Sequence, residues 1–278
     1  MSDVRTDAAP PGFERALRFM DRKAARAIRD YDLIRTGDRI LVAVSGGKDS
    51  LVLLHLLARR RAWRRDGYSL LAAYVEGGQC APGCAFGAEL TATCGELEVP
   101  LRIVSKPMVP ADHELRGQVS PCFVCSWRRR RILFEAAEKE GCSTIALGHH
   151  LDDIAETLLL NLLWHGRHDT MRPRQEMFGG RFAIIRPLAL VEERAVARAA
   201  TIGGLRVHAC ACRYADASKR EVAAEMLRVA REARCHRAAD NLVRSVLRPT
   251  AVVRPSSADE PRPMHEPRPV IERGPAAE

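Results

Sequence analysis

One short stretch combines small, cationic and acidic residues in an order that suits a bound phosphate. Its members are Ser45, Gly46, Gly47, Lys48, Asp49 and Ser50. Glycines let a backbone turn tightly and bring its N–H groups close to a ligand, and the start of a helix adds partial positive charge. Lys48 suits phosphate oxygens, and Asp49 suits a Mg²⁺ ion that bridges phosphates. The stretch therefore predicts a phosphate loop, with an ordinary glycine turn as the simpler alternative.

Cysteines form a second group with chemical potential, because several of the nine lie in close pairs. The pairs are Cys80 and Cys84, Cys122 and Cys125, and Cys210 and Cys212. Cys122 and Cys125 precede an arginine-rich segment, and nearby arginines favour the thiolate form. Two thiolates at this spacing can serve zinc, redox chemistry or an iron–sulfur cluster, and further ligands must come from elsewhere, with Cys210 and Cys212 as candidates. Inert buried thiols are the alternative, and Cys80 with Cys84 is a second possible metal pair.

A third group follows a short apolar run at 144–147. It consists of Gly148, His149, His150, Asp152 and Asp153, with Glu156 one helical turn further on. Asp152 or Asp153 is suited to cap the following helix, and the histidines are suited to contact a phosphate or a base. We take Gly148, His149, Asp152 and Asp153 as candidates for nucleotide binding, with capping or plain surface solvation as the alternative for any single one of them.

The elements that must position these groups alternate along the chain. Strands are predicted at 40–44, 69–75, 101–104, 144–147 and 182–185, and helices at 13–31, 51–59, 89–97, 126–139, 152–163, 191–200 and 218–230. This alternation predicts a Rossmann-like, doubly wound α/β fold with a parallel sheet, preceded by an N-terminal helix. Ligands bind such sheets at the carboxyl ends of the strands, where the first and third groups lie. Residues 1–12 and 251–278 lack periodicity and are predicted to be disordered, which leaves 13–250 as one domain.

Composition narrows the compartment and the partner. The 278 residues carry 44 Lys and Arg against 35 Asp and Glu, a net charge of +9 that suits a phosphate-rich partner. We find no signal peptide, and no apolar stretch approaches the roughly 20 residues that span a bilayer, so we expect a cytoplasmic protein without a membrane partner. In a reducing compartment, cysteines are more often free, metal-bound or catalytic than disulfide-bonded.

Four segments together resemble the tRNA 2-thiocytidine synthetases of the TtcA type, a family of PP-loop ATP pyrophosphatases. The segments are S-G-G-K-D-S at 45–50, C-F-V-C at 122–125 before a basic helix, I-A-L-G-H-H-L-D-D-I-A-E-T-L-L-L-N at 145–161, and I-I-R-P-L-A at 184–189. Neither Gly-x4-Gly-Lys-Ser/Thr nor Gly-x-Gly-x-x-Gly is present, which separates the phosphate loop from two other nucleotide loops. The resemblance covers roughly residues 15–250 and implies a PP-loop fold of the adenine nucleotide alpha hydrolase type.

The resemblance also implies an activity. Members of the family use ATP and Mg²⁺ to adenylate the C2 oxygen of cytidine 32 in tRNA, and sulfur from a cysteine desulfurase replaces that oxygen with the help of a 4Fe–4S cluster held by three cysteines. Carried over, residues 45–50 bind ATP, Lys48 and Asp49 act in catalysis with Asp49 on Mg²⁺, and Cys122, Cys125 and Cys212 hold the cluster, with Cys210 in reserve for Cys212. Homodimers occur in the family and are an expectation here.

The chain departs from the family pattern at three places. Residues 76–84 replace a loop that contains Asp-Gln in the family, a C-x-C at Cys210 and Cys212 replaces a C-x-x-C, and a proline-rich tail replaces a downstream segment. Two alternatives follow. One is another adenylating tRNA modifier, similar to lysidine synthetase or a thiouridine synthetase, and the other is a non-catalytic paralogue that binds nucleotide or metal.

Arginine runs and tryptophans are candidates for contact with RNA. The arginines are Arg59, Arg60, Arg61, Arg64 and Arg65 in one run and Arg128, Arg129, Arg130 and Arg131 in another. They are suited to track phosphates, although charge runs are usually solvated faces. Trp63, Trp127 and Trp164 are suited to stack on a splayed base, with packing in the core as the alternative for each.

Overall fold

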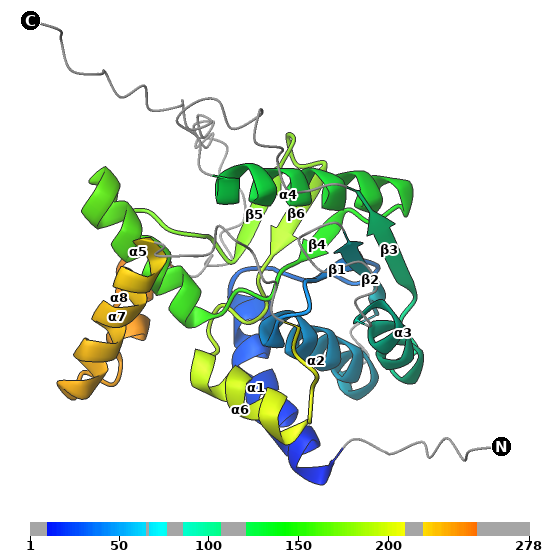
Figure 1. Cartoon of the computed structure of the whole chain (residues 1–278), viewed down its shortest axis with the longest axis horizontal. Coiled ribbons are helices and arrows are strands. Elements are labelled where there is room, and N and C mark those ends of the chain that lie inside the picture. The colour runs from blue at the N-terminus through cyan, green and yellow to red at the C-terminus, as the bar shows by residue number, and fades with distance from the viewer. Residues whose placement is uncertain (1–9, 65–66, 77–85, 107–120, 209–218, 249–278) are drawn as a thin grey trace, which may run out of the picture.

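A computed structural model describes residues 10–64, 67–76, 86–106, 121–208 and 219–248 (Figure 1). The predicted disordered tail at 251–278 lies outside these residues, as do residues 1–9 of the predicted disordered N-terminus. The first helix begins at Pro11, two residues before the predicted start. Within the described part of the chain, no helix is long and apolar enough to cross a membrane.

Six strands form one sheet in the described residues. They are β1 (Arg39–Val44), β2 (Ser69–Glu76), β3 (Leu101–Ser105), β4 (Thr144–Ala146), β5 (Arg174–Met177) and β6 (Phe182–Ile185). Their order across the sheet is β3-β2-β1-β4-β6-β5, and every neighbouring pair is parallel except β5 with β6. The predicted parallel, doubly wound sheet is confirmed. The antiparallel edge strand β5 was not predicted, because its sequence Arg-Gln-Glu-Met has no apolar alternation.

Helices cover both faces of this sheet. They are α1 (Pro11–Asp30), α2 (Lys48–Arg64), α3 (Phe86–Glu96), α4 (Pro121–Lys139), α5 (Leu151–His165), α6 (Glu193–Ile202), α7 (Lys219–Glu232) and α8 (Ala238–Val246). Figure 1 shows α4 on one side of the sheet and α1, α2, α3 and α6 on the other. Helices α5, α7 and α8 pack together beside the sheet around Ile154, Leu227 and Val243. Helix α8 is short and was not predicted.

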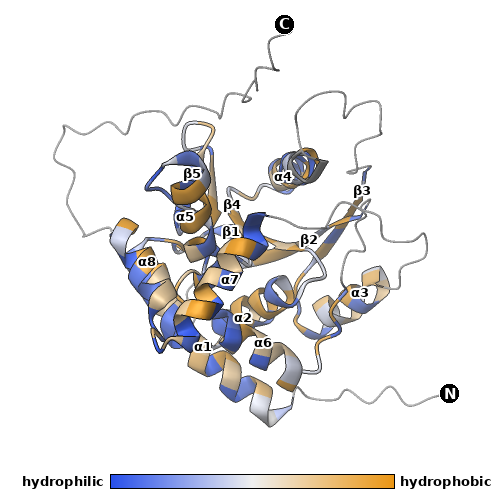
Figure 2. Cartoon of the chain, turned by 60° about the vertical axis from the view of Figure 1, so that its left-hand side comes forward, coloured by the Kyte–Doolittle hydropathy of each residue, from blue (hydrophilic) through white to orange (hydrophobic). Residues whose placement is uncertain are grey.

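The strands are buried on both faces, as parallel strands between two helical layers should be. In β1, Ile40, Val42 and Val44 point into the core shared with α1, α2 and α6, while Leu41 points into the core shared with α4. The central strands lie in hydrophobic colours in Figure 2, between helices whose outer faces are polar. A short apolar run such as 40–44 is therefore explained by burial on both sides.

Part of the first arginine run is used inside the fold. Asp21 of α1 is 3% exposed and accepts hydrogen bonds from Arg60, at 2.5 Å, and from Arg64, at 2.9 Å. Arg60 is itself buried, and Arg18 lies 4.4 Å from the ring centre of the half-buried Trp63. Burial of a carboxylate is tolerated when it is paired and hydrogen-bonded in this way. These contacts join α1 to α2, so Arg60, Arg64 and Trp63 serve packing in this structure.

Candidate active site

The candidate site lies where the sheet reverses its direction of winding. From β1 the chain moves outward to β2 and β3, and it then returns to form β4 on the other side of β1. Ligands of open α/β sheets bind at such a switch point, outside the carboxyl ends of the strands. The phosphate loop, residues 45–50, directly follows β1, and residues 147–150 directly follow β4. Two of the predicted groups therefore meet at one edge of the sheet.

The phosphate loop is shaped by glycine and held by a serine hydroxyl. Gly46 has a φ of +87°, in the left-handed region that favours glycine. The Ser50 hydroxyl donates to the carbonyl of Gly47 at 2.9 Å and accepts from the backbone N–H of Ser45 at 3.0 Å. Helix α2 begins at Lys48, so its unpaired N–H groups face the loop. The local geometry is that of an anion site at a helix N-terminus.

Gly148 sets how closely the two loops approach each other. A Cβ atom built on Gly148 would lie 2.9 Å from the carbonyl carbon of Asp49 and 2.9 Å from the backbone nitrogen of Ser50. No side chain fits at that distance, because the neighbouring atoms belong to backbone. The predicted importance of Gly148 therefore has a steric cause, which is direct backbone contact between the end of β4 and the first turn of α2.

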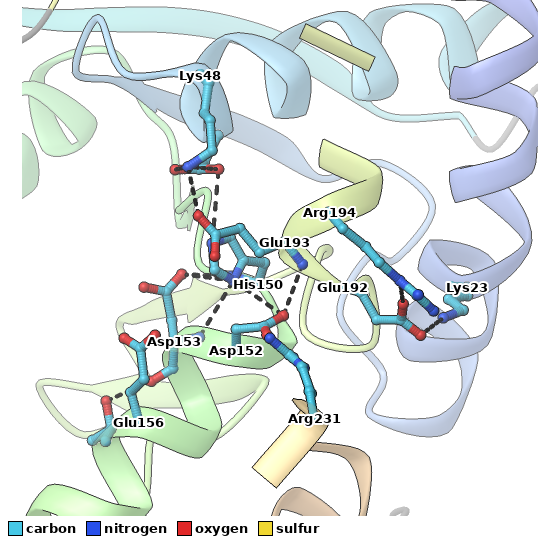
Figure 3. Close-up of polar contacts among 12 residues, drawn as sticks. Lys23, Lys48, His150, Asp152, Asp153, Glu156, Glu192, Glu193, Arg194 and Arg231 are labelled. Atoms are coloured by element: carbon cyan, nitrogen blue, oxygen red, sulfur yellow. Dashed lines mark hydrogen bonds and ion pairs between the residues drawn. The ribbon is translucent and has the colours of Figure 1, made fainter. Parts of the chain in front are cut away.

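Charges gather around Lys48, as Figure 3 shows. Its Nζ lies 3.3 Å from Oδ1 of Asp49 and 3.1 Å from Oε1 of Glu193. Burial alone would lower the pKa of Lys48, but Asp49 and Glu193 outweigh burial and raise it, so the lysine stays cationic. Burial raises the pKa of Asp49, while Lys48 and His150 oppose that rise.

Asp49 has a buried carboxylate oxygen that suits a metal ion. Its Oδ1 atom forms an ion pair with Lys48 but accepts no hydrogen bond within the described residues. A buried carboxylate oxygen that accepts no hydrogen bond is costly unless a ligand or a cation completes it. Mg²⁺ prefers carboxylate and phosphate oxygens, so the atom fits the predicted role of Asp49 when a nucleotide is bound.

His150 caps helix α5, a role that we had predicted for Asp152 or Asp153. The His150 Nδ1 atom accepts from the backbone N–H of Asp153 at 3.3 Å, and the carboxylate of Asp153 accepts from the backbone N–H of His150 at 2.9 Å. This reciprocal pair is a capping box in which histidine takes the place of serine. The Nε2 atom of His150 lies 3.8 Å from Oδ1 of Asp49, so the cap also faces the phosphate loop.

Asp152 points away from the loop, although we predicted that it binds nucleotide. It is 1% exposed, its Oδ2 accepts from the backbone N–H of Glu193 at 2.7 Å, and its Oδ1 pairs with Arg231 of α7. The structure thus gives Asp152 a place among helices α5, α6 and α7. Asp153, the other carboxylate that we predict to bind nucleotide, lines the same cavity as the phosphate loop.

His149 faces the site in its neutral form. Its Nδ1 atom accepts from Nε of Arg186 at 3.3 Å, and burial together with Arg186 lowers its pKa to about 4. Arg186 is 5% exposed and also donates to the backbone carbonyl of Arg172. At neutral pH, His149 therefore offers hydrogen bonds and no charge. Arg186 belongs to the I-I-R-P-L segment, but sequence reasoning had not singled it out.

A cavity of about 310 Å³ opens between the phosphate loop and helix α4. Six predicted residues line it, namely Ser45, Asp49, Ser50, Gly148, His149 and Asp153. Helix α4 contributes Ser126, Arg129 and Arg130 from the opposite wall. Cys125, whose side chain is half-buried, directly precedes Ser126. The cavity therefore lies between a phosphate-binding geometry and the helix that carries the C-x-x-C.

The structure describes only some of the cysteines that we predict to bind a metal or a cluster. The C-x-x-C lies inside the first turns of α4, whereas we had placed it before the helix. The side chain of Cys122 is not described, and Cys210, Cys212, Cys80 and Cys84 lie outside the described residues. The last described residue before Cys210 is His208, whose backbone N–H donates to the carbonyl of Gly46 at 2.9 Å. The ring of His208 packs against Phe86, and its Nε2 lies 2.9 Å from Glu89.

Sequence reasoning missed Glu193, His150 as a cap, and His208. In the sequence, Glu193 is part of an acidic start to a predicted helix. Many surface helices begin in this way, so the pattern does not indicate a contact with the phosphate loop. Its contact with Lys48 joins residues 145 positions apart, which no local pattern can indicate.

Comparison with known proteins agrees with this geometry. Residues 18–209 match the model of the PP-loop domain family. A relative from Geobacter sulfurreducens, named tRNA-cytidine(32) 2-sulfurtransferase, is 39% identical over 193 residues, which cover 67% of this chain and 72% of the relative. The chain belongs to this PP-loop family. The matched residues 18–209 include the phosphate loop, the residues after β4 and the helix that carries the C-x-x-C.

Two further comparisons define the extent of the likeness. A protein of the same name from Anaeromyxobacter dehalogenans is 44% identical over 179 residues, so that 63% of this PP-loop chain spans 60% of the relative's length. The U34-tRNA thiolase NcsA from Methanococcus maripaludis, solved with its 4Fe–4S cluster, matches with a TM-score of 0.67 and 24% sequence identity. That match covers 84% of this chain and 78% of the thiolase, and it supports the fold.

Gly148→Ala tests the backbone contact between the two loops. The added methyl group must push α2 away from β4, which disturbs the phosphate loop, and we expect ATP affinity to fall at least about tenfold. Gly95→Ala is the matched control, because a Cβ on Gly95 of α3 meets nothing within 4 Å. Calorimetric titration with ATP measures both variants. Equal affinities for Gly148→Ala and Gly95→Ala would contradict the steric argument.

Glu156 gives a pH dependence that can be measured. It is buried beside Asp153, and burial followed by Asp153 raises its pKa from 4.5 to about 7. The folded chain therefore holds this proton more tightly than the unfolded chain, so stability falls as the pH rises from 4.5 to 7. Glu156→Gln removes this loss, and we expect it to gain on the order of 1 kcal/mol over wild type near pH 8 and little near pH 5.

Urea denaturation at the two pH values measures this difference. The control is Glu221→Gln, because Glu221 is an exposed carboxylate of α7 on the same side of the molecule. Its stability should follow that of wild type at both pH values. A difference between Glu156→Gln and wild type that stays constant with pH would show that Glu156 ionises normally.

Proposed function

We propose that this chain uses ATP to adenylate the C2 oxygen of cytidine 32 in tRNA, and that sulfur then replaces that oxygen. The observation that carries the proposal is one cavity with two walls. One wall is a phosphate loop at a helix N-terminus, and the other is the helix that carries Cys122 and Cys125. The names of the relatives and the breadth of the match support the same reaction.

The first step is attack of the cytosine C2 oxygen on the α-phosphorus of ATP. The bond between the α-phosphorus and the bridging oxygen breaks, and pyrophosphate leaves. Lys48 and the N–H groups at the start of α2 stabilise the charge that develops on the phosphates. Asp49 would hold Mg²⁺ there, where the ion would neutralise phosphate charge. Arg129 and Arg130 add positive charge from the opposite wall of the cavity.

The second step is attack of sulfide on C2, after a two-electron reductant has brought the persulfide sulfur of the desulfurase to the sulfide level. The C2–O bond breaks, the electron pair goes to oxygen, and AMP leaves, so adenylation converts a poor leaving group into a good one. Cys125 fits a thiolate ligand, because it is a half-buried cysteine on α4 that directly precedes Ser126 in the cavity wall. Cys122, Cys125 and Cys212 would hold a 4Fe–4S cluster, with Cys210 as the reserve for the third position. When bound, the cluster would supply iron for sulfur delivery.

Substrate and partners follow from the same proposal. The substrate is tRNA, and a cysteine desulfurase supplies the sulfur, with a homodimer as the expected assembly. Trp127 supports contact with a splayed base, because its side chain is 53% exposed on α4 with Arg131 6.0 Å from its ring centre. Trp164 is also partly exposed, with Lys219 5.9 Å from its ring.

Lys48→Ala tests the adenylation step. Without the ammonium group the phosphates lose the positive charge that the loop itself supplies, and we expect tRNA-dependent pyrophosphate release to fall about 100-fold or more. Lys139→Ala is the control, because Lys139 is an exposed lysine at the end of α4. Pyrophosphate is measured with bulk tRNA and ATP. Unchanged release in Lys48→Ala would exclude this chain as the adenylating enzyme and favour a non-catalytic nucleotide binder.

Cys125→Ala tests the sulfur-transfer step. After anaerobic purification we expect roughly four irons and four acid-labile sulfides per wild-type chain, and loss of most of them in the variant. Cys235→Ala, which removes an exposed free cysteine, should keep the wild-type content. Zinc in place of iron, or no metal in either protein, would point to an adenylating tRNA modifier of the cluster-free kind.

A further inference from the structure

Lys48 is held from two sides by carboxylates, and one of them comes from a distant part of the chain. Glu193 Oε1 lies 3.1 Å from the Nζ atom of Lys48, and Asp49 Oδ1 lies 3.3 Å from it. Asp49 is the next residue in the phosphate loop, whereas Glu193 is the first residue of α6. The lysine that the proposed function assigns to ATP phosphates is therefore already paired (Figure 3).

The position of Glu193 is fixed by its backbone. Residue 192, at the start of α6, provides no side-chain cap. The missing acceptor comes from Asp152 of α5, whose Oδ2 accepts from the Glu193 N–H at 2.7 Å. Arg231 of α7 pairs with the other oxygen of Asp152. A buried carboxylate held by two partners is a firm anchor, so the start of α6 stays within reach of the phosphate loop.

The neighbouring glutamate shows that this contact is specific to position 193. Glu192 Oε1 lies 3.1 Å from Nζ of Lys23 in α1, and its other oxygen pairs with Arg194. Figure 3 shows the two glutamates turned to opposite sides, one toward Lys48 and the other toward Lys23. The two glutamates are neighbours in sequence at the start of α6, but Glu193 is the one that meets the phosphate loop.

We propose that Glu193 is a positioning residue that competes with phosphate for Lys48. It holds the ammonium group when no nucleotide is present, and it must yield when ATP or pyrophosphate arrives. The phosphates then become the partner of Lys48, and the Glu193 carboxylate remains nearby as a like charge. Glu193 thus weakens the binding of substrate and of pyrophosphate together, which favours release of the product after adenylation. This inference rests on the proposed binding of ATP at the phosphate loop.

Glu193→Gln removes the competing charge and keeps the size of the side chain. We expect the Kd values for ATP and for pyrophosphate to fall about two- to fivefold, as for loss of one partly exposed ion pair. The KM for ATP should fall with them, kcat should not increase, and inhibition by added pyrophosphate should become stronger. The gain should shrink at high salt, because mobile ions screen a partly exposed charge.

Calorimetric titration of wild type, Glu193→Gln and Glu192→Gln with pyrophosphate, and with ATP and Mg²⁺, is the experiment. Tighter binding of both ligands by Glu193→Gln, with Glu192→Gln unchanged, supports the inference. Equal or weaker binding by Glu193→Gln, or the same gain in Glu192→Gln, overturns it. A wild type that binds neither ligand would refute the proposed function and this inference with it, whereas a wild type that binds ATP but does not thiolate tRNA would refute the proposed thiolation alone.

Discussion

The contact between the backbone of Gly148 and the first turn of α2 is the constraint on which the site depends. It brings the ends of β1 and β4 together with no side chain between them. His150, two residues later, then lies close enough to Asp49 to influence its ionisation. His149 is directed into the cavity by the same turn. A wider separation would leave the phosphate loop intact as a local structure, but it would move Gly148, His149 and His150 away from it.

Charge balance is the second feature that holds the region together. Asp49, Asp152, Asp153, Glu156 and Glu193 lie near one another, and burial raises the pKa values of Asp49 and Glu156. Lys48 opposes this rise at Asp49 and Arg220 opposes it at Glu156, while Arg231 pairs with Asp152 and Lys48 also pairs with Glu193. Some of the chain's lysines and arginines are therefore paired with acidic residues of the fold itself. Arg60 and Arg64, which pair with Asp21, show the same use of arginine on the other side of the sheet.

Much of the fold could be predicted from sequence, because buried parallel strands leave short apolar runs and the helices between them are long. The phosphate loop and Gly148 were predictable for a similar reason, since their roles depend on backbone geometry that only certain residues permit. We expected His150 to contact a phosphate or a base, but it caps α5, and Asp152 turns to α6 because a carboxylate beside a helix start is equally suited to its own helix or to a neighbouring one. Only the tertiary structure shows which helix such a carboxylate caps. Asp152 lies on α5 and caps α6. The edge strand β5 lacked a signal because one side of it has no neighbouring strand.

The arrangement of α2 and α4 is compatible with the proposal that phosphate chemistry and thiolate chemistry share one cavity. Helix α4 packs on the face of the sheet opposite to α2, so its first turns reach over the carboxyl ends of the strands from the other side. Ser126, Arg129 and Arg130 then face the loop that follows β1, and Cys125 directly precedes them. In the proposed reaction, a base placed between these walls would meet the α-phosphorus on one side and a sulfur source on the other. Its oxygen would attack phosphorus first and sulfur would then attack C2, and one shared cavity suits this order because the adenylated base must meet sulfur before water reaches it.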